Sequence, residues 1–319
     1  MRGKTRLAIF LAALAGFDSR AEDDSIKTGF VAAQKAAQES NRAAQLKTSP
    51  PLPQKRLCSD DPIFSRLKSD SKDAPVTVYY PAAQVEQARA ILLQAEKSYR
   101  ELRHFFNAAP SSGFSVYLAQ NRAHLNLMYK KQSPEWVVGF GLSDSEVAVL
   151  DPKDWTEGSR KFVNLDRLIK HEMVHAFTQG LNGKKQASPC FYIDNKKEAA
   201  PSPFWFEEGL AVYVSGQLED WANAVRYDPA GKRFAQMTDG GYPVFGTIAE
   251  FLFERFGRDK ILAVIRALPA DYLSENNRSE TERILYSELG GENRLEADWL
   301  QFVLKRYPSG GKPAASTPH

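Results

Sequence analysis

Apolar and polar residues alternate in two ways in the first half of the chain, and the two patterns predict strands and helices. Apolar residues at every second position, as at 76–80, are typical of a strand with one buried face. Apolar residues three or four positions apart, as at 82–106, are typical of an amphipathic helix. The predicted elements are strand 76–80, helix 82–106, strand 114–118, a short helix at 121–131, and a hairpin of strands 136–141 and 147–150 around Ser143-Asp144-Ser145.

The second half of the chain shows helical spacing only. Apolar residues recur at helical intervals from Leu165 to Phe177, and Gly180 followed by Leu181-Asn182-Gly183 predicts the end of this helix. Ser202 as N-cap and Pro203 at the first helical position predict the start of another. Because strands and helices come first and helices alone follow, the expected fold class is α+β.

The first of these helices contains the pentapeptide His171-Glu172-Met173-Val174-His175. Residues four positions apart project from one helix face, so both imidazole rings could bind one Zn²⁺. Glu172 would then lie beside the metal as the base for a metal-bound water. The alternative is a helix with two surface histidines and a solvated glutamate.

A third ligand would decide the kind of zinc site. A catalytic site uses three protein ligands and keeps one position for water, whereas a structural site uses four. No histidine follows His175 within the next few helical turns, so carboxylates remain as candidates, and Glu207 and Glu208 lie on the next predicted helix. The other histidines of the chain are His104, His124 and His319.

The sequence FWFEEGLAVY at 204–213 resembles the W-x-x-E-G-x-A-x-Y stretch of gluzincin metallopeptidases. In that family the Glu directly before the Gly is the third zinc ligand, which implies Glu208 and not Glu207. A lone Glu is usually exposed, so a solvated Glu208 is the alternative. Three further residues of this segment are expected to pack in the core: Trp205, Leu210 and Tyr213.

The resemblance extends to Gly240–Leu268, which is similar to the Tyr-containing helix, "ERFG" turn and following helix of small bacterial gluzincin-type peptidase domains. In related peptidases a Tyr downstream of the Glu ligand stabilises the oxyanion. Tyr242, at the head of its helix, is the first candidate for this role and Tyr227 the second. The alternative for Tyr242 is a packing residue with a solvated hydroxyl.

Two departures from the family pattern concern the cleft. His175 and Glu208 are further apart than in thermolysin or the aminopeptidases, so residues 182–203 are expected to form a surface insertion near the cleft. The chain also lacks a G-A-M-E-N segment, which disfavours an aminopeptidase. In gluzincins the strand before the zinc helix binds an extended peptide, which makes the 137–150 hairpin the candidate for substrate pairing. Its alternative is an internal sheet edge without that role.

The N-terminus has the pattern of a secretory signal peptide at 1–21. Three basic residues precede the apolar run 7–17, and Ser19-Arg20-Ala21 is a small-residue cleavage site. The expected location is therefore the periplasm or the exterior, with an uncleaved anchor or an amphipathic helix as the alternative. The apolar run is too short to span a bilayer, and no later stretch approaches that length.

Four segments are expected: the signal peptide, an Ala/Gln-rich segment with a Pro-rich linker at 22–56, a zincin-like metallopeptidase domain at 57–307, and a disordered tail at 308–319. The chain has 319 residues, 43% hydrophobic and 25% charged, which is ordinary for a soluble globular protein. A net charge of +3 indicates no nucleic-acid partner. Cys58 and Cys190 could pair in an oxidising compartment or remain thiols.

Two classes of function fit these residues. The first is an exported zinc metallopeptidase that acts on peptide or protein substrates, with Zn²⁺ on His171, His175 and Glu208 and with Glu172 as general base. The second is an exported zinc-binding scaffold that keeps the fold and binds a partner. A glycan hydrolase is a third hypothesis with less support, because no pair of carboxylates at suitable spacing stands out. The sequence indicates neither an oligomeric state nor the carboxylate that orients a ligand histidine.

Overall fold

The computed structural model describes residues 59, 61–110, 113–129, 132–143, 145–182, 204–221, 234, 241–269, 272 and 275–307. The chain divides into two units, Met1–Pro53 and Gln54–His319, and all described residues belong to the second. The expected signal peptide, the linker, both cysteines, residues 183–203 of the expected insertion and the tail lie outside the described residues. In the part of the chain that is described, no helix is long and apolar enough to cross a membrane.

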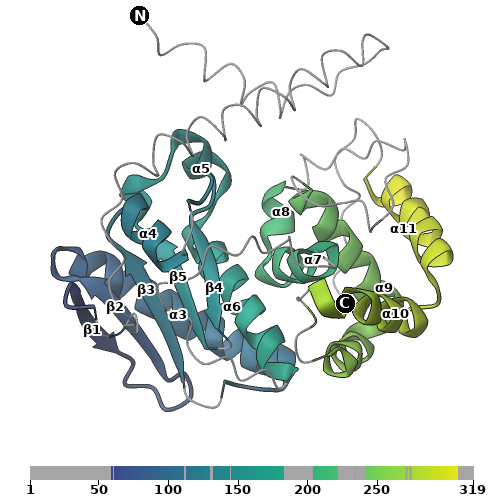
Figure 1. Cartoon of the computed structure of the whole chain (residues 1–319), viewed down its shortest axis with the longest axis horizontal. Helices are drawn as coiled ribbons and strands as arrows, with labels where there is room; N and C mark the ends of the chain where they lie inside the picture. The colour runs from purple at the N-terminus through teal and green to yellow at the C-terminus, as the bar shows by residue number, and fades with distance from the viewer. Residues whose placement is uncertain are drawn as a thin grey trace, which may run out of the picture. The chain divides into compact units, whose positions relative to one another are not determined.

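A five-stranded mixed sheet forms the first part of this unit (Figure 1). Its order is β1-β2-β3-β5-β4; β2, β3 and β5 run parallel, and the edge strands β1 and β4 are antiparallel to their neighbours. The strands are β1 Phe64–Lys68, β2 Val76–Pro81, β3 Phe114–Ala119, β4 Gly139–Ser143 and β5 Glu146–Leu150.

Two long helices pack on the sheet and on each other. Helix α3 (Val85–Phe106) contacts β2, and α6 (Leu165–Leu181) contacts β4 and β5. The apolar stripe of α3 is buried because its residues recur three or four positions apart. Shorter helices complete this part: the 3-10 helices η2 (Ala82–Gln84) and η3 (Pro152–Asp154), and the α-helices α4 (Arg122–Tyr129) and α5 (Glu157–Phe162).

The second part of the unit is helical. Helix α7 (Phe204–Ser215) packs against both α6 and α9 (Tyr242–Ala267), and so connects the helical part to the sheet-containing part. The remaining helices are α8 (Gln217–Trp221), η6 (Glu275–Asn277), α10 (Arg278–Glu288) and α11 (Glu292–Arg306).

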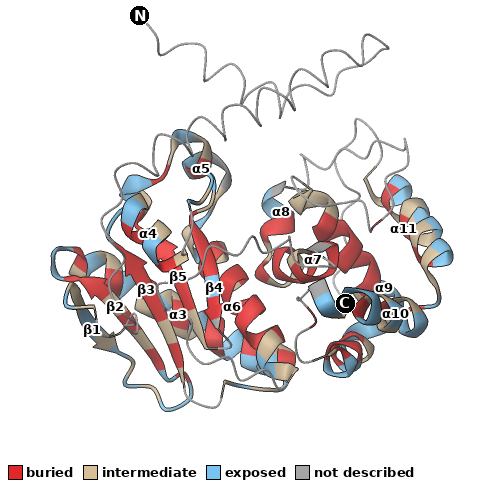
Figure 2. Ribbon diagram, in the orientation of Figure 1, coloured by how far each residue is buried: buried red, intermediate tan, exposed pale blue. Residues whose placement is uncertain are grey.

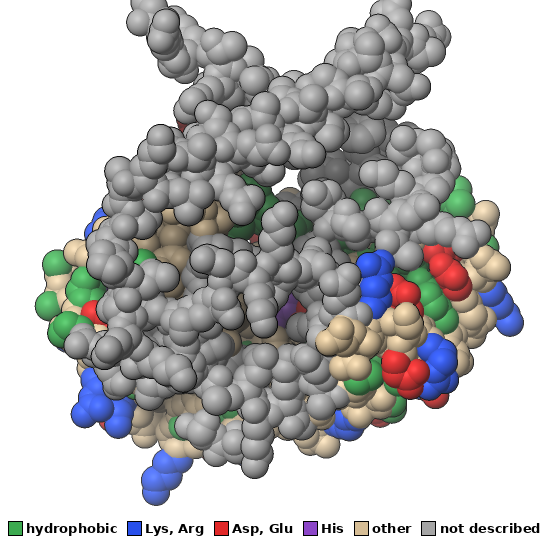
Figure 3. All heavy atoms as spheres, in the orientation of Figure 1, with side chains coloured by type: hydrophobic (Ala, Val, Ile, Leu, Met, Phe, Trp, Pro, Cys, Tyr) green, Lys and Arg blue, Asp and Glu red, His purple; other side chains and the backbone are tan. Residues whose placement is uncertain are grey.

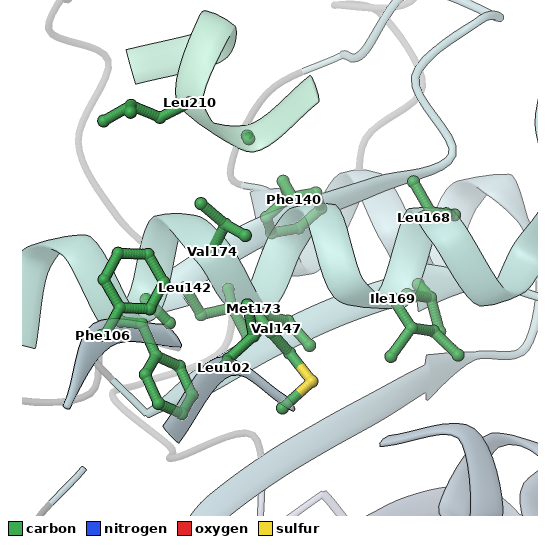
Figure 4. Close-up of a cluster of buried hydrophobic side chains, with 14 of the residues drawn as sticks. Leu102, Phe106, Phe140, Leu142, Val147, Leu168, Ile169, Met173, Val174 and Leu210 are labelled. Atoms are coloured by element: carbon green, nitrogen blue, oxygen red, sulfur yellow. The ribbon is translucent and has the colours of Figure 1, made fainter. Parts of the chain in front are cut away.

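The buried face of α6 holds the pentapeptide firmly in the core. Met173 and Val174 are fully buried and belong to one apolar cluster with Leu102 of α3, Leu142 of β4 and Val147 of β5 (Figure 4). Burying a side chain of this size contributes roughly 1.5–3 kcal/mol. Buried residues continue from the sheet through α6 and α7 into α9 (Figure 2), so the helix that carries both histidines has little freedom to rotate or shift.

The structure confirms the α+β class and the predicted strands and helices, with shifted ends. The short strand β1 was not predicted, because its residues are mostly exposed and show no clean alternation. The predicted helix 82–106 divides into η2 and α3. The "ERFG" turn is a single break within α9, where Gly257 has φ 74°.

Candidate metal site

His171 and His175 lie one turn apart on α6, and the start of this helix is fixed by a cap. The side chain of Asn164 accepts hydrogen bonds from the backbone N–H groups of Asp166 and Arg167, at 2.8 and 3.3 Å. The two imidazole rings meet edge to face, and their Nε2 atoms are 3.2 Å apart. Both residues are buried, so the alternative of two surface histidines is wrong.

Glu208 on α7 completes a group of three possible ligands. Its Oε2 lies 3.3 Å from Nε2 of His171 and 3.6 Å from Nε2 of His175. The side chain of Glu208 is only 14% exposed, so the alternative of a solvated glutamate is also wrong. One ligand atom from each residue lies within 4.8 Å of the others, and among the described residues this is the group that could hold a metal ion.

The atoms of this group suit a divalent cation. Oε2 of Glu208 is buried and faces both Nε2 atoms, at 3.3 and 3.6 Å, without meeting the geometry of a hydrogen bond to any described residue. Two imidazole nitrogens and one carboxylate oxygen are donors that zinc accepts, and three protein ligands leave a position free for water or substrate. The residues present therefore fit a metal ion.

Glu207, the residue next to Glu208, orients one of the two rings. Nδ1 of His175 donates to Oε1 of Glu207 across 2.9 Å, and the buried hydroxyl of Tyr272 donates to the other carboxylate oxygen. The bond at Nδ1 keeps the Nε2 atom directed toward Glu208 and His171. Sequence reasoning set Glu207 aside and did not consider Tyr272; the only local signal was the doubled glutamate before Gly209.

The charges of this cluster favour a cation between the residues. Burial disfavours the charged ring of His175, but the carboxylates of Glu208 and Glu207 outweigh burial and raise its pKa well above the usual value. Burial also acts against the charged form of Glu208, yet His175 and His171 hold the pKa of that carboxyl down to about 2. Glu208 is therefore ionised at neutral pH.

Glu172 lies beside this group without belonging to it. It is buried under β4, and the backbone N–H of Gly141 donates to its carboxylate. Burial raises the pKa of Glu172, His171 and His175 lower it, Glu208 raises it again, and the net direction is upward. Glycine at 139 permits this arrangement, because an added Cβ would lie 3.3 Å from Oε1 of Glu172 and 3.3 Å from the carbonyl oxygen of Ala148.

Tyr242, in the first turn of α9, lies beside the same group of residues. Its ring centroid is 6.3 Å from that of His171. Burial, then the nearby Glu208 and Glu172, raise the pKa of Tyr242 well above its usual value, so its hydroxyl keeps its proton at neutral pH. The second candidate, Tyr227, lies outside the described residues.

The other predicted or considered residues lie elsewhere. His104 is exposed on α3, and His124 is buried against the Phe64 ring, with its Nε2 3.7 Å from Asp61. Trp205 and Leu210 are buried as expected, and Tyr213 is partly buried against Phe253.

The predicted hairpin forms the edge of the sheet next to α6. Strand β4 pairs with β5 only, among the described strands, and Gly139 and Gly141 lie over Glu172 and His175. In Figure 3 a histidine side chain is visible near the middle of the face shown.

No model of a known protein family matches this chain, and the search of curated proteins found no match. The function is therefore inferred from the residues of the site.

Proposed function

We propose that this chain is an exported zinc-dependent metallopeptidase with a zincin-like fold of the gluzincin type. The observation that supports this proposal best is the convergence of His171, His175 and Glu208 from two helices, with Glu172 adjacent to the group and outside it. Two histidines and a glutamate would hold the metal, and Glu207 would keep the ring of His175 aligned.

A zinc ion bound here would lower the pKa of a bound water toward about 7 and polarise the carbonyl group of a peptide bond. Glu172 is the base in this proposal. Its raised pKa suits a group that accepts a proton from water and then delivers it to the leaving amine. The burial of Glu172 also keeps its carboxylate in one orientation, under the N–H of Gly141.

Tyr242 supplies the hydrogen-bond donor for the developing oxyanion. Its hydroxyl keeps its proton beside two carboxylates, Glu208 and Glu172, and its ring centroid is 6.3 Å from that of His171. A donor placed in a buried site is worth roughly 2.7–4 kcal/mol of transition-state stabilisation in comparable oxyanion sites.

The substrate would bind as an extended peptide along β4. This strand is at the edge of the sheet among the described strands, and Gly139 and Gly141 lie over Glu172 and His175. Main-chain pairing of this kind binds peptides with little dependence on sequence, so side-chain preference must come from neighbouring residues.

A zinc-binding scaffold is the alternative, and Glu172 argues against it. A scaffold needs the ligands only, whereas this site also buries the Glu172 carboxylate, with a raised pKa, under strand β4. Burying an ionisable group that makes no contribution to metal binding is costly, which favours a catalytic role.

The direct test of this function combines metal analysis with peptide hydrolysis. The purified protein should contain about one zinc ion per chain, should cleave members of a mixed peptide library, and should lose cleavage on chelation and recover it with added zinc. Glu208→Ala should lose most of the bound zinc. Equal zinc in Glu208→Ala and wild type would remove Glu208 as a ligand, and a zinc-loaded wild type that cleaves nothing would favour the scaffold.

Export is tested separately from the chemistry. The proposed signal peptide predicts that exported protein begins near Glu22. N-terminal sequencing of exported material that returned an intact Met1 would contradict this part of the proposal.

A further inference from the structure

Trp136 is a large aromatic residue that remains exposed beside the candidate site. Its side chain is 49% exposed, whereas Trp155, Trp205 and Trp299 are all buried. A single exposed apolar residue is common and carries no meaning by itself. Trp136 is of interest because hydrogen bonds hold its loop and because its ring contacts Tyr242.

The loop that carries Trp136 is fixed to α4 by side-chain hydrogen bonds. The guanidinium of Arg122 donates to the carbonyl oxygen of Val137, to that of Glu135 at 2.9 Å and to the hydroxyl of Ser133 at 3.1 Å. The side chain of Asn126 accepts from both the backbone N–H and the hydroxyl of Ser133. Both residues on either side of Trp136 are thus held by one guanidinium, so its backbone has little freedom.

The position of Trp136 places it next to the reacting groups. Its ring lies edge to face with that of Tyr242, with centroids 6.0 Å apart, and the ring of Tyr242 is 6.3 Å from that of His171. Strand β4 begins three residues later, at Gly139. A peptide paired with β4 would therefore pass Trp136 close to the bond that is cleaved.

We propose that Trp136 determines the specificity of the site by contacting a large apolar or aromatic side chain of the substrate, next to the cleaved bond. This proposal rests on the proposed peptidase function. An aromatic side chain of the substrate would cover the exposed ring and gain both area burial and ring-to-ring geometry. Because the loop is already fixed, little conformational entropy is lost on binding.

The surroundings of Trp136 favour an apolar occupant. Further aromatic rings lie near Tyr242: Tyr129 is close enough to raise the pKa of Tyr242, and its ring centroid is 4.6 Å from that of Phe140.

The test uses matched peptides that differ only by Phe, Lys or Ser at one position, varied on each side of the cleaved bond. At one of these positions the wild type should prefer Phe over Ser by roughly 10–100-fold in kcat/KM, mostly through KM. Trp136→Ala should reduce that preference to less than about threefold. Leu304→Ala is the matched control, because Leu304 is 46% exposed on α11, and it should keep the preference.

Three results would overturn the proposal: a wild type with no preference for Phe, a preference that survives Trp136→Ala, or a stronger preference for Lys that Trp136→Ala removes. The peptidase proposal fails on a different observation, the absence of any cleavage. In that case calorimetric binding of the same peptides tests Trp136 independently. Tighter binding of the Phe peptide, lost in Trp136→Ala, supports the contact, and equal binding of the Phe and Ser peptides by wild type contradicts it.

Discussion

At the scale of single residues, the two consecutive glutamates of α7 contact opposite edges of one imidazole ring. Oε2 of Glu208 faces Nε2 of His175, and Oε1 of Glu207 accepts from its Nδ1. Neighbouring residues on a helix point about 100° apart. The side chains of Glu207 and Glu208 can therefore reach two different edges of the His175 ring, which projects from the adjacent helix α6. One glutamate is therefore available as a ligand while the other fixes the ring.

The first prediction concerns Tyr272, whose hydroxyl holds Glu207 in place. Tyr272→Phe removes this hydrogen bond and leaves the ring in the core, so Glu207 should orient His175 less well. The affinity for zinc should fall by roughly 10-fold or more, which is the usual effect of losing such an outer hydrogen bond. Competition with a chromophoric chelator measures this affinity directly.

Tyr307→Phe is the matched control for this prediction. Tyr307 also donates from its hydroxyl to a buried glutamate, Glu250, but it lies at the end of α11 and contacts no ligand. Both variants lose a bond of the same kind, and only Tyr272→Phe should lose zinc affinity. Equal zinc affinity in the two variants would show that Tyr272 has no positioning role.

The sequence indicated some residues of the site and not others, for a physical reason. His171, Glu172 and His175 form a local pattern on one helix, and Glu208 was indicated by the family-like segment around it. The contact of Glu207 with Tyr272 joins residues 65 positions apart. The spacing of residues along the chain does not predict such a contact. It depends on how α7 packs and on whether the segment after α9, which contains Tyr272, lies next to α7.

At the scale of secondary-structure elements, glycines set the distance between α7 and α9. An added Cβ at Gly209 would lie 2.6 Å from the carbonyl oxygen of Phe245, and one at Gly246 would lie 2.6 Å from a methyl group of Val212. The two helices therefore touch at backbone distance. Glu207 and Glu208 precede Gly209 directly, so this contact also sets how far α7 extends toward α6.

The second prediction is that Gly209→Ala displaces α7. The new methyl group would meet backbone and not a flexible side chain, so the helices must separate, which should destabilise the protein by roughly 1–3 kcal/mol. Zinc affinity should fall as well, because Glu208 moves with α7. Urea unfolding and chelator competition measure the two effects.

Gly180→Ala adds the same methyl group to an exposed helical position near the end of α6. This control should be neutral or stabilising by up to about 1 kcal/mol, because alanine favours the helix more than glycine does. A Gly209→Ala protein as stable as this control would mean that the contact between α7 and α9 is not tight.

The elements predicted best from the sequence are those whose apolar residues recur at regular helical or strand spacing. Helix α3 buries one continuous stripe, helix α6 is buried on all faces from His171 to Thr178, and β2 alternates cleanly. Strand β1 lacks such a pattern because it lies at the sheet edge with mostly exposed residues. The break at Gly257 was indicated by its turn sequence, whereas the continuation of α9 beyond it depends on burial of Ile261, Leu262 and Ile265.

At the scale of the whole unit, the candidate site joins its two parts. The histidines come from α6, which packs on the sheet, and the carboxylates of Glu207 and Glu208 come from α7 in the helical part. A metal bound to both helices would therefore stabilise the contact between the parts and, with it, the folded state.

The third prediction is that zinc raises the thermal stability of the protein. A ligand that binds only the folded state at a free concentration of 100 Kd contributes about 2.7 kcal/mol, which corresponds to a rise in Tm of roughly 5–10 °C for a domain of this size. Calorimetry with zinc and after chelation measures this rise. His175→Ala should show no such response, and a wild type whose Tm ignores zinc would argue against a site that joins the two helices.

The central claim is that Glu172 performs proton transfer while His171, His175 and Glu208 hold the metal. The most direct measurement compares zinc content, Tm and peptide hydrolysis of wild type and Glu172→Gln, since the amide keeps the size of the side chain and removes the base. The account predicts equal zinc, a similar Tm and a loss of roughly 10²–10⁴-fold in kcat. Hydrolysis at the wild-type rate, or loss of zinc from Glu172→Gln, would contradict it.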